Sequence, residues 1–507
     1  MGTIELDAIV NQIIMKKKKN NIKVTFPTIY SCVLGIIPSF NMGCSNSASK
    51  YERSNVVFVF ADELRGQDLG YNGNRDVITP NLNKLATESI NLFNTISCCP
   101  VSCPYRGSLL TGQYPLTTGV FVNDVQLNPE AQSISKVFKA AGYKTAYIGK
   151  WHLDGHGRNS FIPGDRRQGF EYWKVMECTH NYNNSYYWDN ENGKKKWDGY
   201  DAYAQTTEAI DYIKETAKAG KQFFMVVSWG PPHTPFETAP ESCKQLYRDK
   251  TLTLRPNVPS EETVKTINDL IGYYGHITAL DSCIGELQIA IKEAGIEKNT
   301  IFIFTSDHGN MVNSHGFSFK QRPYEESINV PFLIKYPNGF GLKGITNDML
   351  LNTPDIMPTL LGLCGLSIPK TVEGEDKSQS LLGKTADTTE AVLIACYQPF
   401  GQWPRNKGGK EYRGVRTKQY SYVRDIDGPW LLFDNKNDNY QMNNLVNQPE
   451  YETIQKELDK KLSRLLLKTH DTFRPGMEYI KKWGYVVDET ESIPYNKTNY
   501  QGLPVEK

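Results

Sequence analysis

The stretch NVVFVFADE, residues 55–63, sets the pattern for the rest of the chain. Residues 55–60 form an almost continuous apolar run, and the acidic side chains of Asp62 and Glu63 follow it closely. A short apolar run without polar alternation is typical of a strand buried on both faces of a sheet. We therefore expect the two acidic side chains at the carboxyl end of a buried strand.

The same pattern occurs three more times along the chain. The further apolar runs are residues 144–148, 222–228 and 300–305. They lead into the polar clusters Gly149–His152, Pro231–His233 and Ser306–Gly309. In open α/β sheets, ligands bind outside the carboxyl ends of the parallel strands. The four polar clusters are therefore expected to converge on one site.

Helical patterns separate these apolar runs. Thr79 precedes Pro80 and a helical spacing of apolar residues, so we expect Thr79 to cap a helix. Ser133 should begin a second helix, and Gly142 should end it. An amphipathic pattern at 264–291 predicts a long helix with its apolar stripe packed on the sheet. Strands alternating with helices predict a largely parallel, doubly wound α/β sheet.

The pattern changes after about residue 385. Apolar runs at 391–395, 412–423 and 430–433, with a turn signal at Asp427-Gly428, predict a small antiparallel sheet. A helix with one apolar face should follow, across residues 454–466. This region therefore reads as a smaller C-terminal α+β subdomain.

Length and charge limit the classes of function. At 507 residues, the chain is longer than a single hydrophobic core usually grows, so we expect a catalytic domain at 51–385 and a C-terminal subdomain at 386–507. The net charge of +1 provides no basic surface for a nucleic acid. Apart from the N-terminal region, no segment approaches the roughly 20 apolar residues that span a bilayer, so the mature protein should have no transmembrane helix.

The first 44 residues have the pattern of an export signal. Lysines at 16–19 precede an apolar stretch at 24–40, and Cys44 follows. A basic start is typical of such signals, so we expect translation to begin at Met15. Two outcomes stay open, namely release into the periplasm and lipid anchoring of Cys44 at the cell envelope. An oxidising compartment would permit disulfides, but the cysteine positions do not reveal any pairing.

The most specific motif is SCPYRGSLLTG, residues 102–112. It resembles the signature of the formylglycine-dependent type I sulfatases of the alkaline phosphatase superfamily, which is Cys or Ser, any residue, Pro, any residue, Arg, then Leu-Thr-Gly. Cysteines crowd the motif, but only Ser102 has both Pro104 and Arg106 at the required offsets. Tyr105 stands where many relatives carry a small residue. The resemblance also implies an alkaline-phosphatase-like α/β fold, with a large mixed, mostly parallel sheet sandwiched by helices.

The resemblance implies that a sulfatase-maturing enzyme oxidises Ser102 to formylglycine (3-oxoalanine). The hydrated aldehyde is a geminal diol, and its first hydroxyl attacks sulfur to form a covalent sulfo-enzyme intermediate. The second hydroxyl then expels sulfate as the aldehyde forms again, so water does not have to attack that intermediate. Arg106 is expected to anchor the modified residue through its planar fork of donors.

The same resemblance implies a metal site. The expected ligands are Asp62, Glu63, Asp307 and His308, together with the modified Ser102. A cation would offset the charge on the ester oxygens and favour the nucleophilic alkoxide. Ca²⁺ is the expected ion, and the histidine ligand leaves Mg²⁺ or Mn²⁺ as alternatives. The Asp-Glu pair departs from the Asp-Asp pair usual in the family.

Further segments match the family motifs around the sulfate. GKWHL at 149–153 implies that Lys150 binds the sulfate or the hydrated aldehyde, and that His152 acts as a base on the diol. In the segment around His233, the family histidine hydrogen-bonds the ester and can protonate the departing sugar oxygen. Lys320 matches the lysine that shares this duty.

Loops near these motifs are rich in side chains that bind sugars. The candidates to bind the glycan are His156, Arg158, Arg167 and His180. The expected substrate is a sulfated carbohydrate, because the predicted export and the aromatic-rich loops favour a glycan over a steroid or lipid. Two alternatives stay open: a phosphodiesterase or phosphonate monoester hydrolase of the same superfamily, and a non-catalytic protein that binds sulfated glycans.

Overall fold

The computed structural model describes residues 53–191 and 193–495, which belong to one compact unit. The leader predicted at 1–44 lies outside the described residues. Within those ranges, no helix has both the length and the apolar character needed to cross a bilayer.

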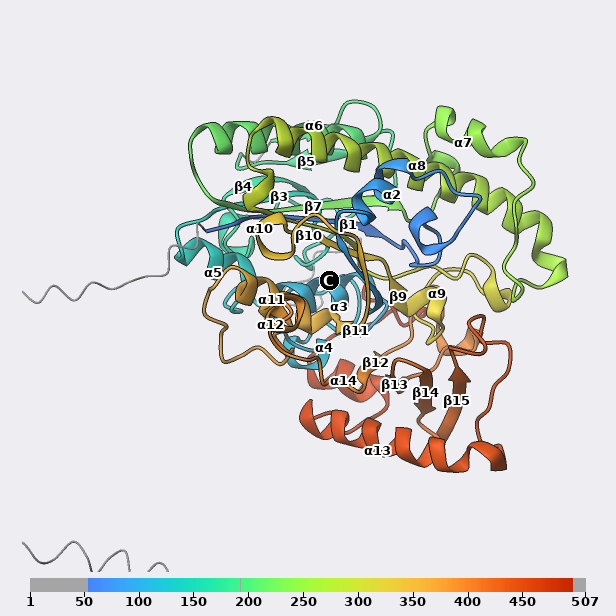
Figure 1. The fold of residues 1–507 in the computed structure, drawn as a ribbon. Helices are drawn as coiled ribbons and strands as arrows, with labels where there is room; N and C mark the ends of the chain where they lie inside the picture. The colour runs from blue at the N-terminus through green and yellow to red at the C-terminus, as the bar shows by residue number, and fades with distance from the viewer. Residues whose placement is uncertain (1–52, 192, 496–507) are drawn as a thin grey trace, which may run out of the picture. The chain divides into compact units, whose positions relative to one another are not determined.

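A large mixed sheet forms the centre of this unit (Figure 1). Its strands are β1 (Asn55–Asp62), β2 (Ile90–Ile96), β3 (Lys144–Lys150), β4 (Tyr172–Met176), β5 (Tyr186–Trp188), β6 (Lys194–Lys196), β7 (Phe223–Pro232), β8 (Thr300–Ser306), β9 (Asn329–Val330), β10 (Phe332–Lys335) and β11 (Ile345–Asn352). They are ordered β11-β2-β10-β8-β1-β7-β3-β4-β5-β6, and β9 pairs with β2.

Helices cover both faces of this sheet. The helices of the described residues are α2 (Pro80–Ala86), α3 (Ser102–Thr111), α4 (Pro115–Thr118), α5 (Ile134–Ala140), α6 (Asp201–Lys218), α7 (Glu241–Arg248), α8 (Thr263–Glu293), α9 (Glu325–Ile328), α10 (Pro337–Phe340), α11 (Thr353–Leu363), α12 (Ser378–Leu381), α13 (Glu452–Lys468) and α14 (Gly476–Lys482). In Figure 1, α2, α6 and α8 lie on one side of the sheet, and α3, α5 and α11 lie on the other.

The alternation of side chains along β1 explains why two cores exist. Val56 and Phe58 point into the core beneath α3, α5 and α11, whereas Val57 and Val59 point into the core beneath α2, α6 and α8. All four side chains are at most 1% exposed. β1 pairs in parallel with β7 and β8, and β3 pairs in parallel with β7. The predicted buried parallel strands and the mostly parallel sheet are thus confirmed.

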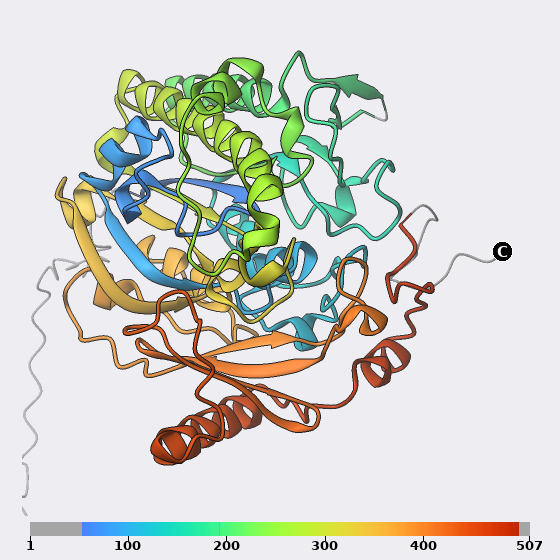
Figure 2. The same ribbon diagram turned by 90° about the vertical axis from the view of Figure 1, so that its right-hand side faces the viewer.

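A second sheet is made by the C-terminal region. It is antiparallel, in the order β12-β13-β14-β15, and its strands are β12 (Val392–Cys396), β13 (Tyr412–Arg416), β14 (Tyr420–Asp425) and β15 (Gly428–Asp434). The view in Figure 2 shows α13 along the outer face of this sheet. The C-terminal α+β subdomain is confirmed, whereas the boundary placed at residue 385 stays a prediction.

Two local predictions need correction. The run at 412–423 is two strands, because the Thr417 hydroxyl accepts a hydrogen bond from Tyr420 N (2.8 Å) and closes a tight turn between them. Thr79 occupies the cap position of α2, but its side chain makes no cap hydrogen bond to the helix. Ser133, in contrast, does cap α5 by accepting from the Lys136 amide. The long helix predicted at 264–291 is α8.

Candidate active site

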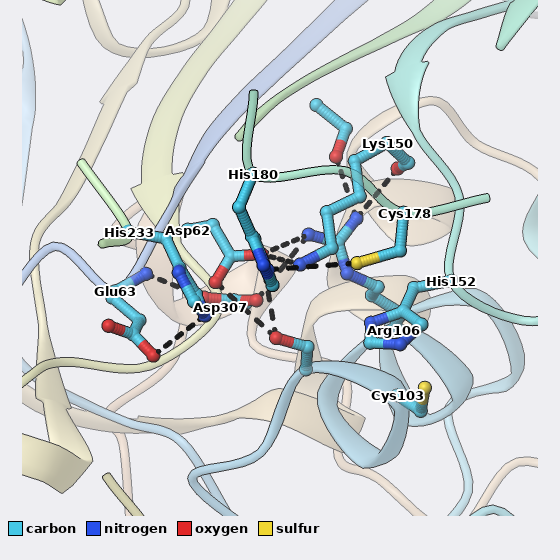
Figure 3. Close-up of polar contacts among 12 residues, drawn as sticks. Asp62, Glu63, Cys103, Arg106, Lys150, His152, Cys178, His180, His233 and Asp307 are labelled. Carbon is cyan, nitrogen blue, oxygen red and sulfur yellow. Dashed lines mark hydrogen bonds and ion pairs between the residues drawn. The ribbon is translucent and has the colours of Figure 1, made fainter. Parts of the chain in front are cut away.

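The polar clusters at the strand ends do meet in space, as the parallel sheet predicted. Asp62 ends β1, Lys150 ends β3, and Asp307 follows directly on β8. Figure 3 shows these side chains turned toward one another, with Arg106 beside them. All four residues are at most 3% exposed. The cluster therefore lies at the carboxyl edge of the sheet, shielded from water.

Ser102 is the first residue of α3 and is completely buried. Its hydroxyl lies 3.2 Å from Nε2 of His308 and 3.3 Å from Oδ1 of Asp62. The N-terminus of a helix carries partial positive charge, which favours an anion at this position. Ser102 thus faces the strand-end carboxylates from the opposite side of the site.

Arg106, one turn further along α3, makes hydrogen bonds to several residues of the site. Its Nη2 donates to Asp62 Oδ2 (3.0 Å) and Asp307 Oδ2 (3.4 Å), and its Nη1 donates to Ser228 Oγ (2.7 Å). Lys150 Nζ donates to the same Asp62 oxygen at 2.6 Å. Two cations therefore neutralise Asp62 while also fixing its orientation.

A group of potential metal ligands lies beside Ser102. One ligand atom each from Asp62, Glu63 and His308 lies within 4.8 Å of the others. His308 Nδ1 lies 3.0 Å from the Gly309 carbonyl and must donate to it, so Nε2 keeps its lone pair for a metal. Buried carboxylate oxygens plus one imidazole nitrogen are a donor set that fits a divalent cation.

Asp307, the fourth predicted ligand, is engaged mainly with protein groups. Its Oδ1 accepts from the backbone amides of Glu63 (3.1 Å) and His308 (2.8 Å). The same oxygen is 3.6 Å from His308 Nε2. Asp307 therefore borders the ligand group and holds two of its three residues, Glu63 and His308. Glu63 has a left-handed φ of 67°, a conformation that side chains other than glycine adopt only when their surroundings enforce it.

His233 and Lys320 form a pair next to Glu63. Lys320 Nζ lies 2.6 Å from Glu63 Oε1 and 3.2 Å from His233 Nε2. His233 Nδ1 lies 2.8 Å from the Thr234 carbonyl and must donate to it, so Nε2 faces the lysine as an acceptor. His180 stacks on the His233 ring with a centroid separation of 4.3 Å.

The remaining predicted residues are held by other partners. His152 Nε2 lies 3.1 Å from Asp124 Oδ1, and Arg158 donates to both oxygens of the same carboxylate at 2.7 Å. Arg167 donates to the Ile162 carbonyl (2.8 Å). His156 Nδ1 lies 2.7 Å from the Asp154 carbonyl. None of these contacts tests sugar binding, so the glycan-binding roles of His156, Arg158, Arg167 and His180 stay predictions.

Some residues of the site were not found from the sequence. Asp124 joins His152 and Arg158, and Asn310 donates to Glu63 Oε2 at 2.5 Å. Cys178 Sγ lies 3.8 Å from His180 Nε2. Asn310 could have been suspected because it follows the strand-end cluster at 306–309. Asp124 and Cys178 lie in loops without a motif, and no sequence signal singles them out.

Burial and neighbouring charges set the ionisation of these groups. Burial alone would raise the pKa of Asp62, but Lys150 and the cations around it hold that pKa well below the usual value. Burial and the Asp62 charge raise the pKa of Asp307 to about 6. Burial also opposes ionisation of Cys178, yet Lys150 and His152 lower the pKa of this thiol well below its usual value. Burial and the neighbouring charges together thus favour the anionic forms of Asp62 and Cys178 and disfavour that of Asp307.

Two family models match the chain. The model described as Sulfatase matches residues 54–366. The model described as N-sulphoglucosamine sulphohydrolase, C-terminal, matches residues 313–468. Together they span nearly all of the described residues.

Similar proteins support the same family. An ulvan-active sulfatase from Formosa agariphila is 42% identical over 499 residues, covering 96% of each chain. An endo-4-O-sulfatase from Bacteroides thetaiotaomicron is 32% identical, covering 84% of this chain and 94% of its own. One similar solved structure is described under the metabolism of multiple glycosaminoglycans by Bacteroides thetaiotaomicron. It has a TM-score of 0.77 at 30% identity, covering 85% of this chain and 99% of its own. The chain therefore belongs to the sulfatase family, with an alkaline-phosphatase-like fold, and is a sulfuric ester hydrolase.

Proposed function

We propose that this protein removes sulfate from monoesters on a sulfated polysaccharide, with Ser102 matured to formylglycine. The observation that carries the proposal is the placement of the Ser102 hydroxyl, 3.2 Å from His308 and 3.3 Å from Asp62, at the N-terminus of α3. The names of the relatives support a glycan substrate, because one is ulvan-active and another is an endo-4-O-sulfatase. Ulvan is the first candidate, since that relative is similar over almost the whole chain.

A metal would complete this site. The sulfatase family generally uses a divalent metal, and we assign its ligands to Asp62, Glu63, Asp307 and His308, with the group at position 102 facing it. We propose Ca²⁺, because most of these ligands are oxygens, with Mg²⁺ or Mn²⁺ as the alternative that the imidazole allows. Bound there, the cation supplies Lewis-acid stabilisation of the charge on the ester oxygens.

The remaining catalytic roles belong to residues on two sides of the proposed sulfate position. Arg106 and Lys150 hold Asp62 and line the side from which the group at position 102 attacks. The Lys320–His233 pair lies on the side of Glu63 and can pass a proton to the departing sugar oxygen. Formylglycine at position 102 supplies a second hydroxyl, which lets sulfate leave without attack by water.

The test is a paired assay on the matured protein. Sulfated ulvan oligosaccharides, 4-O-sulfated glycosaminoglycan oligosaccharides, and an aryl sulfate with its phosphate counterpart would be compared. We expect sulfate release from a sulfated oligosaccharide, phosphate ester cleavage at least about 10²-fold slower, and no turnover by Ser102→Ala. Faster cleavage of phosphate would support the phosphodiesterase alternative. Binding without any turnover by matured protein would support the glycan-binding alternative.

We also propose that the protein is exported and acts in the periplasm or anchored at the cell envelope. The lysine run at 16–19, the apolar stretch at 24–40 and Cys44 support this location. Fractionation of cells that express the chain and its Cys44→Ala variant is the test. An anchored protein should move from the membrane fraction to the soluble periplasmic fraction in the variant, whereas a cytoplasmic location of both would contradict export.

A further inference from the structure

Asp124 is a buried carboxylate to which the steps above give no role. It is 8% exposed and has a left-handed φ of 64°. Its Oδ1 lies 3.1 Å from His152 Nε2, and its two oxygens accept from Nε and Nη2 of Arg158, each at 2.7 Å. His152 also has a left-handed φ, of 57°. Two strained residues in direct contact indicate that the surrounding structure enforces their arrangement.

The loop that carries Asp124 is fastened to the turn that carries Ser102. Asn123 Oδ1 accepts from the Cys103 amide at 3.0 Å, and the Asp124 amide donates to Cys103 Sγ at 3.2 Å. Cys103 is the residue after Ser102 at the start of α3. The position of Asp124, and with it the position of His152, is therefore set relative to Ser102.

The contacts of Asp124 also decide which nitrogen of His152 carries the proton. The Arg158 fork and His152 hold the pKa of Asp124 well below its usual value even though the carboxyl is buried, so it is a carboxylate and can only accept. Nε2 of His152 must then donate. Nδ1 of His152 is buried without a hydrogen-bond partner among the described residues, so in the neutral ring it keeps its lone pair. Lys150 and Cys178 are the other ionisable groups that act on the His152 ring.

We propose that Asp124 is a positioning residue that holds His152 with its proton on Nε2, so that Nδ1 is the atom that accepts a proton during catalysis. The catalytic part of this inference rests on the proposed function, in which His152 is the base. The tautomer does not depend on turnover, so it can be tested even in protein whose Ser102 is not matured.

The first experiment is nitrogen NMR of histidine-labelled protein, with the His152 signals assigned from the His152→Ala variant. The native protein should show a protonated Nε2 and an unprotonated Nδ1. In Asp124→Ala, Nε2 loses the oxygen to which it donates, so the ring should no longer be held in one tautomer and a protonated Nδ1 should appear. A proton on Nδ1 in the native protein, or an unchanged tautomer in the variant, would overturn the proposal.

The second experiment measures kinetics, with rates normalised to the formylglycine content of each variant found by peptide mass spectrometry. Asp124→Asn should lower kcat by about 10²- to 10⁴-fold, the range of a lost general base, and change KM by less than about threefold. In the His152→Ala background the same substitution should cost less than about threefold, because Asp124 then has no base to position. Equal losses in both backgrounds would contradict a role through His152.

A matched control comes from the same stretch of chain. Asp154 is also buried, and it pairs with one arginine and one histidine, Arg166 (2.7 Å) and His156 (3.3 Å). Asp154→Asn therefore removes the same charge from the same kind of cluster. We expect this control to keep the His152 tautomer and kcat within about threefold of the native values. A loss of kcat equal to that of Asp124→Asn would show that the effect is general loss of structure.

Discussion

The site consists of buried charges that neutralise one another with almost no help from water. Its acidic members are Asp62, Glu63 and Asp307, and its basic members are Arg106, Lys150 and Lys320. Removing one partner of a buried ion pair leaves the other charge uncompensated, which costs far more than the pair itself contributes. Loss of Arg106 should cost the most, because its guanidinium pairs with both Asp62 and Asp307.

Replacement of Arg106 by lysine should therefore fail although the charge is kept. Lysine has no planar fork, so it cannot donate to Asp62, Asp307 and Ser228 together. We expect Arg106→Lys to lower kcat/KM by at least about 10²-fold and to reduce the free energy of unfolding by about 1–3 kcal/mol, because buried acceptors lose their donors. Arg413→Lys is the control, because Arg413 is equally buried against Asp471 but lies outside the site. Activity above a tenth of native in Arg106→Lys would contradict this account.

The residues that the sequence predicted are those that motifs mark. Ser102 and Arg106 lie within one continuous signature, and Asp62 and Asp307 lie at the ends of recognisable strands. Asp124 was not predictable, because it lies in one loop and its partners His152 and Arg158 lie in another, at 152–158. Apolar periodicity does not reveal the conformation of such loops. A contact between two irregular segments can be found only in the folded structure.

At the level of elements, a side chain on α8 caps the N-terminus of α2. Asp281 on α8 accepts from the backbone amides of Leu82 (2.7 Å) and Asn81 (3.1 Å), in the first turn of α2. These amides have no partner within their own helix. The side chain of Thr79 is engaged instead with the Gly70 amide, at 3.1 Å. The sequence located the start of α2 correctly, but a cap supplied from about 200 residues away is invisible to local patterns.

Loss of this cap should weaken the fold and spare the chemistry. Asp281→Ala leaves two amide donors without their partners, and we expect it to reduce the free energy of unfolding by about 2–4 kcal/mol. Asp281→Asn keeps one acceptor and should cost less. Denaturant unfolding measures both losses, and kcat/KM should stay within about twofold of native. Unchanged stability in Asp281→Ala would show that this cap is not needed.

At the level of the whole molecule, the two sheets share one core. Leu393, Val415 and Tyr422 of the second sheet belong to the same buried cluster as Phe58 of the central sheet. Arg416 also donates to Glu325 Oε1 at 2.8 Å, in a buried ion pair between β13 and α9. The apolar runs and turn signals after residue 385 predicted a second sheet, but they could not show that it completes the core of the first.

A shared core predicts that the two regions unfold together. Thermal unfolding followed by fluorescence and by circular dichroism should show one coincident transition. A chain that ends at residue 385 should not fold, because it would expose the apolar surface that the second sheet covers. Two separate transitions, or a soluble and folded chain ending at 385, would contradict a shared core.

The central claim is that residue 102 is chemically converted and acts from that position. Mass spectrometry of the peptide that contains Ser102, from protein produced together with a sulfatase-maturing enzyme, tests it most directly. We predict the loss of two hydrogen atoms at residue 102, in a fraction that rises in proportion to sulfatase activity. Full activity in protein whose Ser102 is entirely unmodified would contradict the claim.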